Sequence, residues 1–331
     1  KKNPMKIIGI GNALVDLMTQ IDNDATLENL NLPKGSMQLV DGENSKKAIG
    51  ATATFKRTIA SGGSAANTIH GLARLDSPVG FIGKIGRDEM GTFFKEDMQK
   101  SNIDTYLLES DTPSGVALAL VSPDGERTFA TYLGAAVEMT ENDISPDIFE
   151  GYDILHIEGY LLQNYSLISQ AIKTAKEKGL LVSVDLASYN VVEDNRDFLN
   201  EMIDQYTDIV FANEEESKAL TGLEPEESVK HLQNRVDIAV VKTGPGGSLV
   251  SMNGQITKVP ANKVNVVDTT GAGDLYASGF LYGLINNYAP YECGLAGTIL
   301  GGEVIQHIGA KIPEELWDDL NNQVKNLKDR D

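Results

Sequence analysis

The stretch VVDTTGAGD spans residues 266–274 and runs directly into an apolar helical pattern from Leu275 to Ile285. The β-branched residues from Val264 to Val267 predict a strand before it, so the order is strand, turn of small residues and helix start. The amides of a first helical turn and the positive end of the helix dipole converge at such a turn. The sequence therefore predicts an α/β unit with an anion-binding site just before Asp274.

Asp274 places a carboxylate where an anion is expected to bind, and the role of this carboxylate has two interpretations. An aspartate near a helix start commonly caps the helix. Alternatively, Asp274 takes a proton from an alcohol while the neighbouring amides stabilise charge on a transferred phosphoryl group. Gly271 and Gly273 would then let a phosphate approach the backbone. The spacing alone leaves both interpretations open.

A second glycine motif, ASGGSAAN at residues 60–67, opens another helical pattern that continues to Leu75. Gly62 and Gly63 permit a ligand to approach the backbone closely, and Asn67 offers both a donor and an acceptor. Small residues at a helix start often serve only for packing, so this motif is weak by itself. Together with the first motif it is specific, and the pair indicates a ligand-binding site.

Short β-branched runs alternate with helical patterns along the chain, which is typical of a mostly parallel sheet covered by helices. Residues 166–178 repeat apolar side chains at three- and four-residue spacing, and residues 88–100 follow the same pattern. We therefore expect an α/β fold with helices on both faces of the sheet. Besides residues 264–267, the expected strands are Ile7–Ile10, Val79–Ile82, Ile154–Ile157, Leu180–Val184, Ile209–Phe211 and Ile238–Val241.

Two stretches interrupt this alternation. Residues 17–41 contain no convincing amphipathic helix, whereas residues 115–132 have the pattern of a β-hairpin with a turn at Ser122-Pro123-Asp124-Gly125. We expect both to form a small β lid, because lids exclude water and complete sites; the alternative is two ordinary surface loops. The predicted division is an α/β catalytic domain of residues 1–16, 42–105 and 136–331 and a β lid of residues 17–41 and 106–135.

The overall composition disfavours several classes of partner. The 331 residues include 48 acidic and 28 basic side chains, a formal charge of −20, which disfavours nucleic acid or an anionic membrane as the main partner. Cys293 is the sole cysteine, so an intrachain disulfide and a thiolate zinc cage are excluded. The four histidines lack ligand spacing. No apolar run approaches about 18 residues and no secretory pattern opens the chain, so we expect a cytoplasmic protein.

The two glycine motifs, together with GKIGRD at residues 83–88, resemble the two signatures of the ribokinase-like (PfkB) carbohydrate kinase family. GNALVD at residues 11–16 resembles the opening of its adenosine kinase branch. The resemblance covers essentially the whole chain, including the two β-rich stretches where the family has its lid. It implies a ribokinase-like three-layer sandwich with a mostly parallel sheet and a small β-sheet lid. It also implies an ATP-dependent kinase that phosphorylates an alcohol group.

The resemblance further implies roles for residues at matching positions. The catalytic base is Asp274, and the anion hole consists of Gly271, Ala272 and Gly273. The acceptor contacts are Asn12, Asp16, Gly62, Gly63 and Asn67. The contacts to ATP and Mg²⁺ are Asn213, Glu216, Thr243, Gly244, Gly246 and Gly247. Asp268 and Thr270 match a monovalent-cation site, for which K⁺ is the candidate ion.

Alternatives stay open for the acceptor and for activity itself. The acceptor is a nucleoside such as adenosine, which the GNALVD opening favours, or a free sugar such as ribose or fructose. A catalytically inactive sugar- or nucleotide-binding protein on the same fold is another alternative. No Gly-x-x-x-x-Gly-Lys loop is present, and Leu14 replaces the third glycine of a dinucleotide fingerprint. The expected partner is a small molecule, and the expected state is a monomer or a lid-mediated homodimer.

Overall fold

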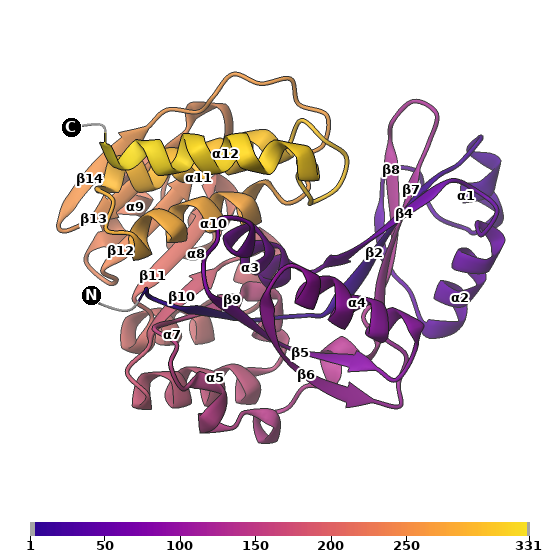
Figure 1. Cartoon of the computed structure of the whole chain (residues 1–331), viewed down its shortest axis with the longest axis horizontal. Helices are drawn as coiled ribbons and strands as arrows, with labels where there is room; N and C mark the ends of the chain where they lie inside the picture. Colours follow the sequence, from indigo (N-terminus) through magenta and orange to yellow (C-terminus); the bar gives the residue numbers. More distant parts are fainter. Residues whose placement is uncertain (1–3, 330–331) are drawn as a thin grey trace.

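A computed structural model describes residues 4–329, which form a large β-sheet with a smaller sheet beside it (Figure 1). Within these residues the large sheet has nine strands in the order β14-β13-β12-β11-β10-β9-β1-β5-β6. Neighbouring strands are parallel except in the pairs β12–β13 and β13–β14, as expected for a mostly parallel sheet. The strands are β1 (Ile7–Ile10), β5 (Val79–Gly86), β6 (Ile103–Ser110), β9 (Ile154–Glu158), β10 (Leu181–Asp185), β11 (Ile209–Asn213), β12 (Ile238–Lys242), β13 (Ser248–Met252) and β14 (Gln255–Val259).

Helices bury both faces of the large sheet, as predicted. In β1, Ile7 belongs to one hydrophobic core and Ile8 and Ile10 to the other, because successive strand residues point to opposite faces. In Figure 1, α10, α11 and α12 lie above the sheet and α5 and α7 lie below it. The helices of the first face are α3 (Ser64–Arg74), α4 (Glu89–Lys100), α10 (Ala272–Ile285), α11 (Pro290–Val304) and α12 (Trp317–Lys325), and those of the second are α5 (Tyr165–Glu177), α6 (Tyr189–Asp194), α7 (Arg196–Tyr206), α8 (Glu214–Thr221) and α9 (Pro225–Gln233). None of the helices in residues 4–329 is both long and apolar enough to cross a membrane.

The smaller sheet has five strands in the described chain, in the order β3-β8-β7-β2-β4. Strands β7 and β8 form the predicted antiparallel hairpin, and β2 pairs with β7 in parallel. Its outer face is covered by α1 and α2, where Leu27 and Ala48 are buried (Figure 1). Met37 and Leu39 of β3 are 66% and 67% exposed. The elements are β2 (Leu14–Gln20), α1 (Ala25–Asn29), β3 (Met37–Leu39), α2 (Gly42–Ala51), β4 (Arg57–Gly62), β7 (Gly115–Val121) and β8 (Arg127–Tyr132).

The strand predicted at residues 264–267 is wrong, because this segment has no regular structure. Val266 and Val267 are 56% and 51% exposed, and the amide of Val267 donates to the carbonyl oxygen of Ile305 instead of to a strand. The segment leaves the sheet after β14 and runs to the end of α11. The β-branched residues favour an extended backbone, but they supply no neighbouring strand to pair with.

Two strands belong to a different sheet from the one that the predicted boundaries of the catalytic domain and the lid would give them. Strand β4 falls within the catalytic segment 42–105, yet it pairs with β2 in the smaller sheet. Strand β6 overlaps the lid segment 106–135, yet it pairs with β5 along its whole length in the large sheet. The division into a catalytic domain and a lid stays a prediction, and the two strands shift where its boundaries would fall.

Candidate active site

A cleft of about 1600 Å³ lies between the smaller sheet and the carboxyl ends of strands in the large sheet. The predicted site residues that line it are Asn12, Asp16, Gly63, Asn67, Asn213, Glu216, Gly244, Gly247, Thr270, Gly271, Ala272, Gly273 and Asp274. Gly62, Thr243, Gly246 and Asp268 do not line it, although each lies next to residues that do. The fold thus gathers the predicted residues around one cleft, while their individual roles stay predictions.

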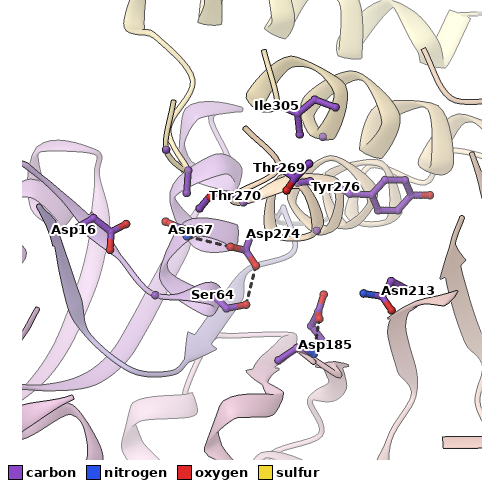
Figure 2. Close-up of a pocket in the computed structure, with 18 of the residues that line it drawn as sticks. Asp16, Ser64, Asn67, Asp185, Asn213, Thr269, Thr270, Asp274, Tyr276 and Ile305 are labelled. Carbon is purple, nitrogen blue, oxygen red and sulfur yellow. Dashed lines mark hydrogen bonds between the residues drawn. The ribbon is translucent and has the colours of Figure 1, made fainter. Parts of the chain in front are cut away.

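Asp274 is held by a neighbouring helix and not by its own (Figure 2). Ser64 Oγ donates to its Oδ1 at 2.7 Å and Asn67 Nδ2 donates to its Oδ2 at 3.0 Å, both from α3. The N-cap residue of α10 is Gly271, and no side chain caps this helix. Asp274 therefore does not act as a helix cap. Burial raises the pKa of Asp274 to about 6, with a further contribution from the charge of Asp185, while the two hydrogen bonds oppose the shift.

The main chain before Asp274 supplies free amides. Gly271 has a φ of +77°, which lets the chain turn sharply into α10 and which suits glycine. The amide of Ala272 donates to the carbonyl oxygen of Thr269 at 3.2 Å. Those of Gly273 and Asp274 make no hydrogen bond within residues 4–329. Two main-chain donors are therefore available beside a carboxylate.

A lysine adds positive charge at the same place. Lys242 ends β12, and its Nζ lies 3.0 Å from the position that a Cβ atom on Gly273 would take. The same Nζ is 3.3 Å from Oδ2 of Asp185. Burial lowers the pKa of Lys242, but the carboxylates of Asp185 and Glu216 outweigh it, so the pKa is raised overall. An ammonium group and free amides thus converge on one spot, an arrangement that suits a phosphate.

Asn213 and Glu216 bind each other at the start of α8. Asn213 Nδ2 donates to Glu216 Oε1 at 2.9 Å, and each backbone amide donates to the other side chain at 2.8 Å. Burial raises the pKa of Glu216 to about 7, while Lys242 opposes the shift. The described residues contain no cluster of three or more side chains arranged for a metal. Since Mg²⁺ usually binds one or two carboxylates together with substrate phosphates, Glu216 fits a nucleotide-bound magnesium ion.

The loop of residues 243–247 connects β12 to β13 as a tight turn. Gly247 has a φ of +94°, and a Cβ there would lie 1.9 Å from the carbonyl oxygen of Val259, so only glycine fits. Thr243 Oγ1 donates to the carbonyl oxygen of Gly247 at 3.1 Å and closes the turn. Gly244 and Gly247 line the cleft, whereas Thr243 and Gly246 serve the turn behind it.

Asp16 reaches the cleft from the smaller sheet, whereas Asp274 reaches it from α10 (Figure 2). Asp16 lies inside β2, where it pairs with Ala60 of β4. Burial raises its pKa to about 6, while Lys311 opposes the shift. Gly63 has a φ of +100°, and a Cβ there would lie 2.1 Å from the carbonyl oxygen of Asn12. This close approach explains the second glycine of the ASGGSAAN motif.

At the predicted monovalent-cation site, the carboxylate of Asp268 is already paired with a positively charged side chain. Asp268 accepts hydrogen bonds from the amides of Thr270 and Gly309, each at 2.7 Å. Arg127 of β8 forms an ion pair with the same carboxylate and lies 3.5 Å from Thr270 Oγ1. The carboxylate of Asp268 therefore fits K⁺ only if Arg127 withdraws from it.

Several cleft residues escaped the sequence analysis. Glu158, Asp185 and Lys242 each end a strand of the large sheet and line the cleft. A polar residue that closes a buried strand in a parallel sheet points to the edge where ligands bind, so this signal was present in the sequence. Lys311, which also lines the cleft, and Arg127, which forms an ion pair with Asp268 outside the cleft lining, carried no such signal.

A model of the pfkB family of carbohydrate kinases matches residues 40–317. The chain belongs to the pfkB carbohydrate kinase family. It is therefore a phosphotransferase, as expected, and its α/β architecture is the ribokinase-like fold. Membership in a kinase family argues against the alternative of an inactive binding protein.

Relatives of this kinase act on different acceptors. The 5-dehydro-2-deoxygluconokinase of Bacillus subtilis is 31% identical over 251 residues, which cover 71% of this chain and 77% of the relative. The adenosine kinase structure from Sinorhizobium meliloti is 31% identical, with a TM-score of 0.84 over 97% of this chain and 99% of that one. A probable sugar kinase from Rhizobium etli is 30% identical, with a TM-score of 0.84 over 97% and 98%. These similarities leave the acceptor of this kinase between a nucleoside and a sugar.

Proposed function

We propose that this kinase transfers the γ-phosphoryl group of ATP to a hydroxyl of a nucleoside such as adenosine, with Asp274 as the general base. The observation that carries the proposal is the half-buried carboxylate of Asp274, which lines the cleft beside the free amides of Gly273 and its own residue. Asp16 approaches the same cleft from the other side. An alcohol and a terminal phosphate can meet between these groups.

The residues divide the reaction between them. Asp274 takes the proton of the acceptor hydroxyl while the hydroxyl oxygen bonds to the γ-phosphorus. The bond between the γ-phosphorus and the bridging oxygen breaks, and ADP leaves with that oxygen. Ser64 and Asn67 keep the carboxylate oriented, and Lys242 and the free amides stabilise charge on the transferred group.

The nucleotide side lies beyond Gly273 along the ends of the later strands. Glu216 and Asn213 line the cleft together with Lys242, whose charge Glu216 stabilises. Gly244 and Gly247, in the turn that follows β12, line the same cleft. When bound with ATP, magnesium supplies charge neutralisation at the β- and γ-phosphates. We assign Glu216 and Asn213 to that ion and the glycine turn to the nucleotide.

A nucleoside is the favoured acceptor because the smaller sheet presents an apolar wall to the cleft. Met37, Leu39, Ile59 and Phe129 line the cleft, and the first three are exposed to it in this structure. A planar nucleobase would cover this surface, whereas a free sugar would leave it in contact with water. The 31% identity to an adenosine kinase over 97% of the chain agrees with this assignment. A free sugar or sugar acid is the second candidate, favoured by the similarity to 5-dehydro-2-deoxygluconokinase.

Release of ADP against a panel of acceptors tests the substrate class. The panel contains adenosine, guanosine, inosine, cytidine, uridine, ribose, fructose and 5-dehydro-2-deoxygluconate, with ATP and Mg²⁺ and with or without K⁺. We expect turnover on a nucleoside, with kcat/KM at least about tenfold above any free sugar, because burying a base gains more than 1.4 kcal/mol. Turnover on sugars or the sugar acid alone would contradict the nucleoside assignment and leave the kinase class intact.

The pH dependence of kcat/KM for the acceptor should reflect two carboxylates. Burial raises the pKa of Asp274 and of Asp16 to about 6, and both must be ionised, one to accept a proton and one to accept hydroxyl hydrogen bonds. The activity is therefore present above pH 6 and falls below it, with a limiting slope of about two on a logarithmic plot. Asp16→Asn should leave a slope of about one. A parent profile that stays flat down to pH 5 would remove both groups from these roles.

A further inference from the structure

Lys311 is a buried cation without a partner on the acceptor side of the cleft. It follows Ala310, which packs directly against Gly271 at the start of α10. Lys311 lines the cleft, and its Nζ is shielded from solvent and makes no hydrogen bond within residues 4–329. An ammonium group in such a place is costly unless something accepts a hydrogen bond from it, so a ligand that supplies an acceptor would offset this cost.

The acids near Lys311 do not supply that partner. Asp16, Asp97 and Asp274 all act on it electrostatically, yet none forms an ion pair with it within 4.0 Å in the described structure. Both oxygens of Asp274 already accept hydrogen bonds from α3. Asp97 accepts a hydrogen bond from the amide of Ser61 at 3.0 Å. Burial lowers the pKa of Lys311 to about 8, with these three carboxylates opposing the shift.

The same wall contains several unsatisfied hydrogen-bond acceptors. The carboxylate of Asp16 makes no hydrogen bond in residues 4–329. Oδ1 of Asn12 and Oδ1 of Asn67 are buried without a partner in the same described part of the chain. One donor and three acceptors therefore face the acceptor end of the cleft. A polyhydroxylated molecule complements this set, because each hydroxyl can donate one hydrogen bond and accept another.

We propose that Lys311 binds the acceptor directly, by donating a hydrogen bond to a hydroxyl or ring oxygen of a neutral polyhydroxylated substrate whose hydroxyl hydrogen Asp16 accepts. This inference rests on the proposed function of the cleft and names the acceptor's chemistry more closely. A carboxylate-bearing acceptor fits poorly, because the negative charges of three aspartates already act on the ammonium group of Lys311. Lys311 therefore selects uncharged acceptors with adjacent oxygens.

The variant Lys311→Met tests this binding role, because methionine keeps most of the length of the unbranched side chain and removes the donor. We expect the KM for the acceptor to rise about 10- to 100-fold, as for a lost hydrogen bond to a charged group, with little change in kcat and in the KM for ATP. On an Asp16→Asn background the same change should raise the acceptor KM again. An unchanged acceptor KM, or no further rise in the double variant, would overturn direct binding.

A melting temperature measured without any ligand separates binding from a structural role. Since the free protein carries the ammonium group unpaired, Lys311→Met should leave the melting temperature unchanged or raise it. Lys46→Met, at an exposed position of α2, is the matched control for loss of a lysine. A fall in the melting temperature of Lys311→Met relative to Lys46→Met would assign Lys311 to folding and overturn the inference. This comparison decides even if the parent protein turns over none of the panel, a result that would refute the proposed function separately.

Discussion

Asp274→Asn is expected to lower kcat by about 10²- to 10⁴-fold while the affinity for ATP is retained. Asparagine has the same shape as aspartate, but it cannot take a proton from the acceptor hydroxyl. The amides of Gly273 and residue 274 remain in place, so phosphate binding persists. Steady-state ADP release gives kcat, and equilibrium titration with a non-hydrolysable ATP analogue gives the affinity.

Thermal unfolding is the control for this variant. Because the pKa of Asp274 is raised in the folded protein, the ionised carboxylate destabilises the fold at pH values above its unfolded pKa. At pH 7 to 8 the neutral asparagine should therefore be equally stable or more stable. A variant that melts normally and turns over like the parent would remove Asp274 from the role of base.

Gly273→Val is expected to lower kcat/KM for ATP by about 10²-fold or more, the scale for losing a main-chain donor to a developing charge. The Cβ position at residue 273 lies 3.0 Å from Lys242 Nζ, so the branched side chain would fill the space between the free amides and the ammonium group. The residue has no positive φ and lies in the first turn of α10, so the fold itself tolerates a side chain there. Gly273→Ala is the matched control and should show a smaller loss, because a single methyl only displaces the flexible lysine. Equal ATP parameters in the valine variant and the parent would mean that the phosphate binds elsewhere.

Much of the fold was predictable because strands that are buried on both faces of the sheet consist mainly of β-branched residues, and such runs are visible in the sequence. The runs at Ile7–Ile10, Ile154–Ile157 and Ile238–Val241 all became strands, as did both arms of the hairpin. Residues 264–267 have the same composition but no neighbouring strand, and pairing is a property of the tertiary structure. The pairing of β4 with β2 could not be predicted either, because it also depends on the tertiary structure. In addition, the small residues of the ASGGSAAN motif at the end of β4 indicated only the start of a helix.

The candidate site was predictable where glycine and helix-start patterns marked it, as at Gly63, Gly271 and Asp274. Lys242 was missed because one polar residue after an apolar run also looks like an ordinary loop start. Arg127 and Lys311 were missed for a deeper reason. Each is distant in sequence from the residues that it approaches. Only the three-dimensional structure shows that Arg127 forms an ion pair with Asp268 and that Nζ of Lys311 is buried without a hydrogen-bond partner in the described residues.

The central claim is that an acceptor alcohol and the terminal phosphate of ATP meet at Asp274. The most direct test follows the phosphorus itself, by phosphorus-31 NMR of reactions that contain ATP, Mg²⁺ and the best acceptor of the panel, for the parent and for Asp274→Asn. The account predicts that the parent forms ADP and a phosphate monoester in equal amounts and that the variant forms almost no ester in the same time. Release of inorganic phosphate without an ester by the parent, or ester formation by the variant at the parent's rate, would contradict it.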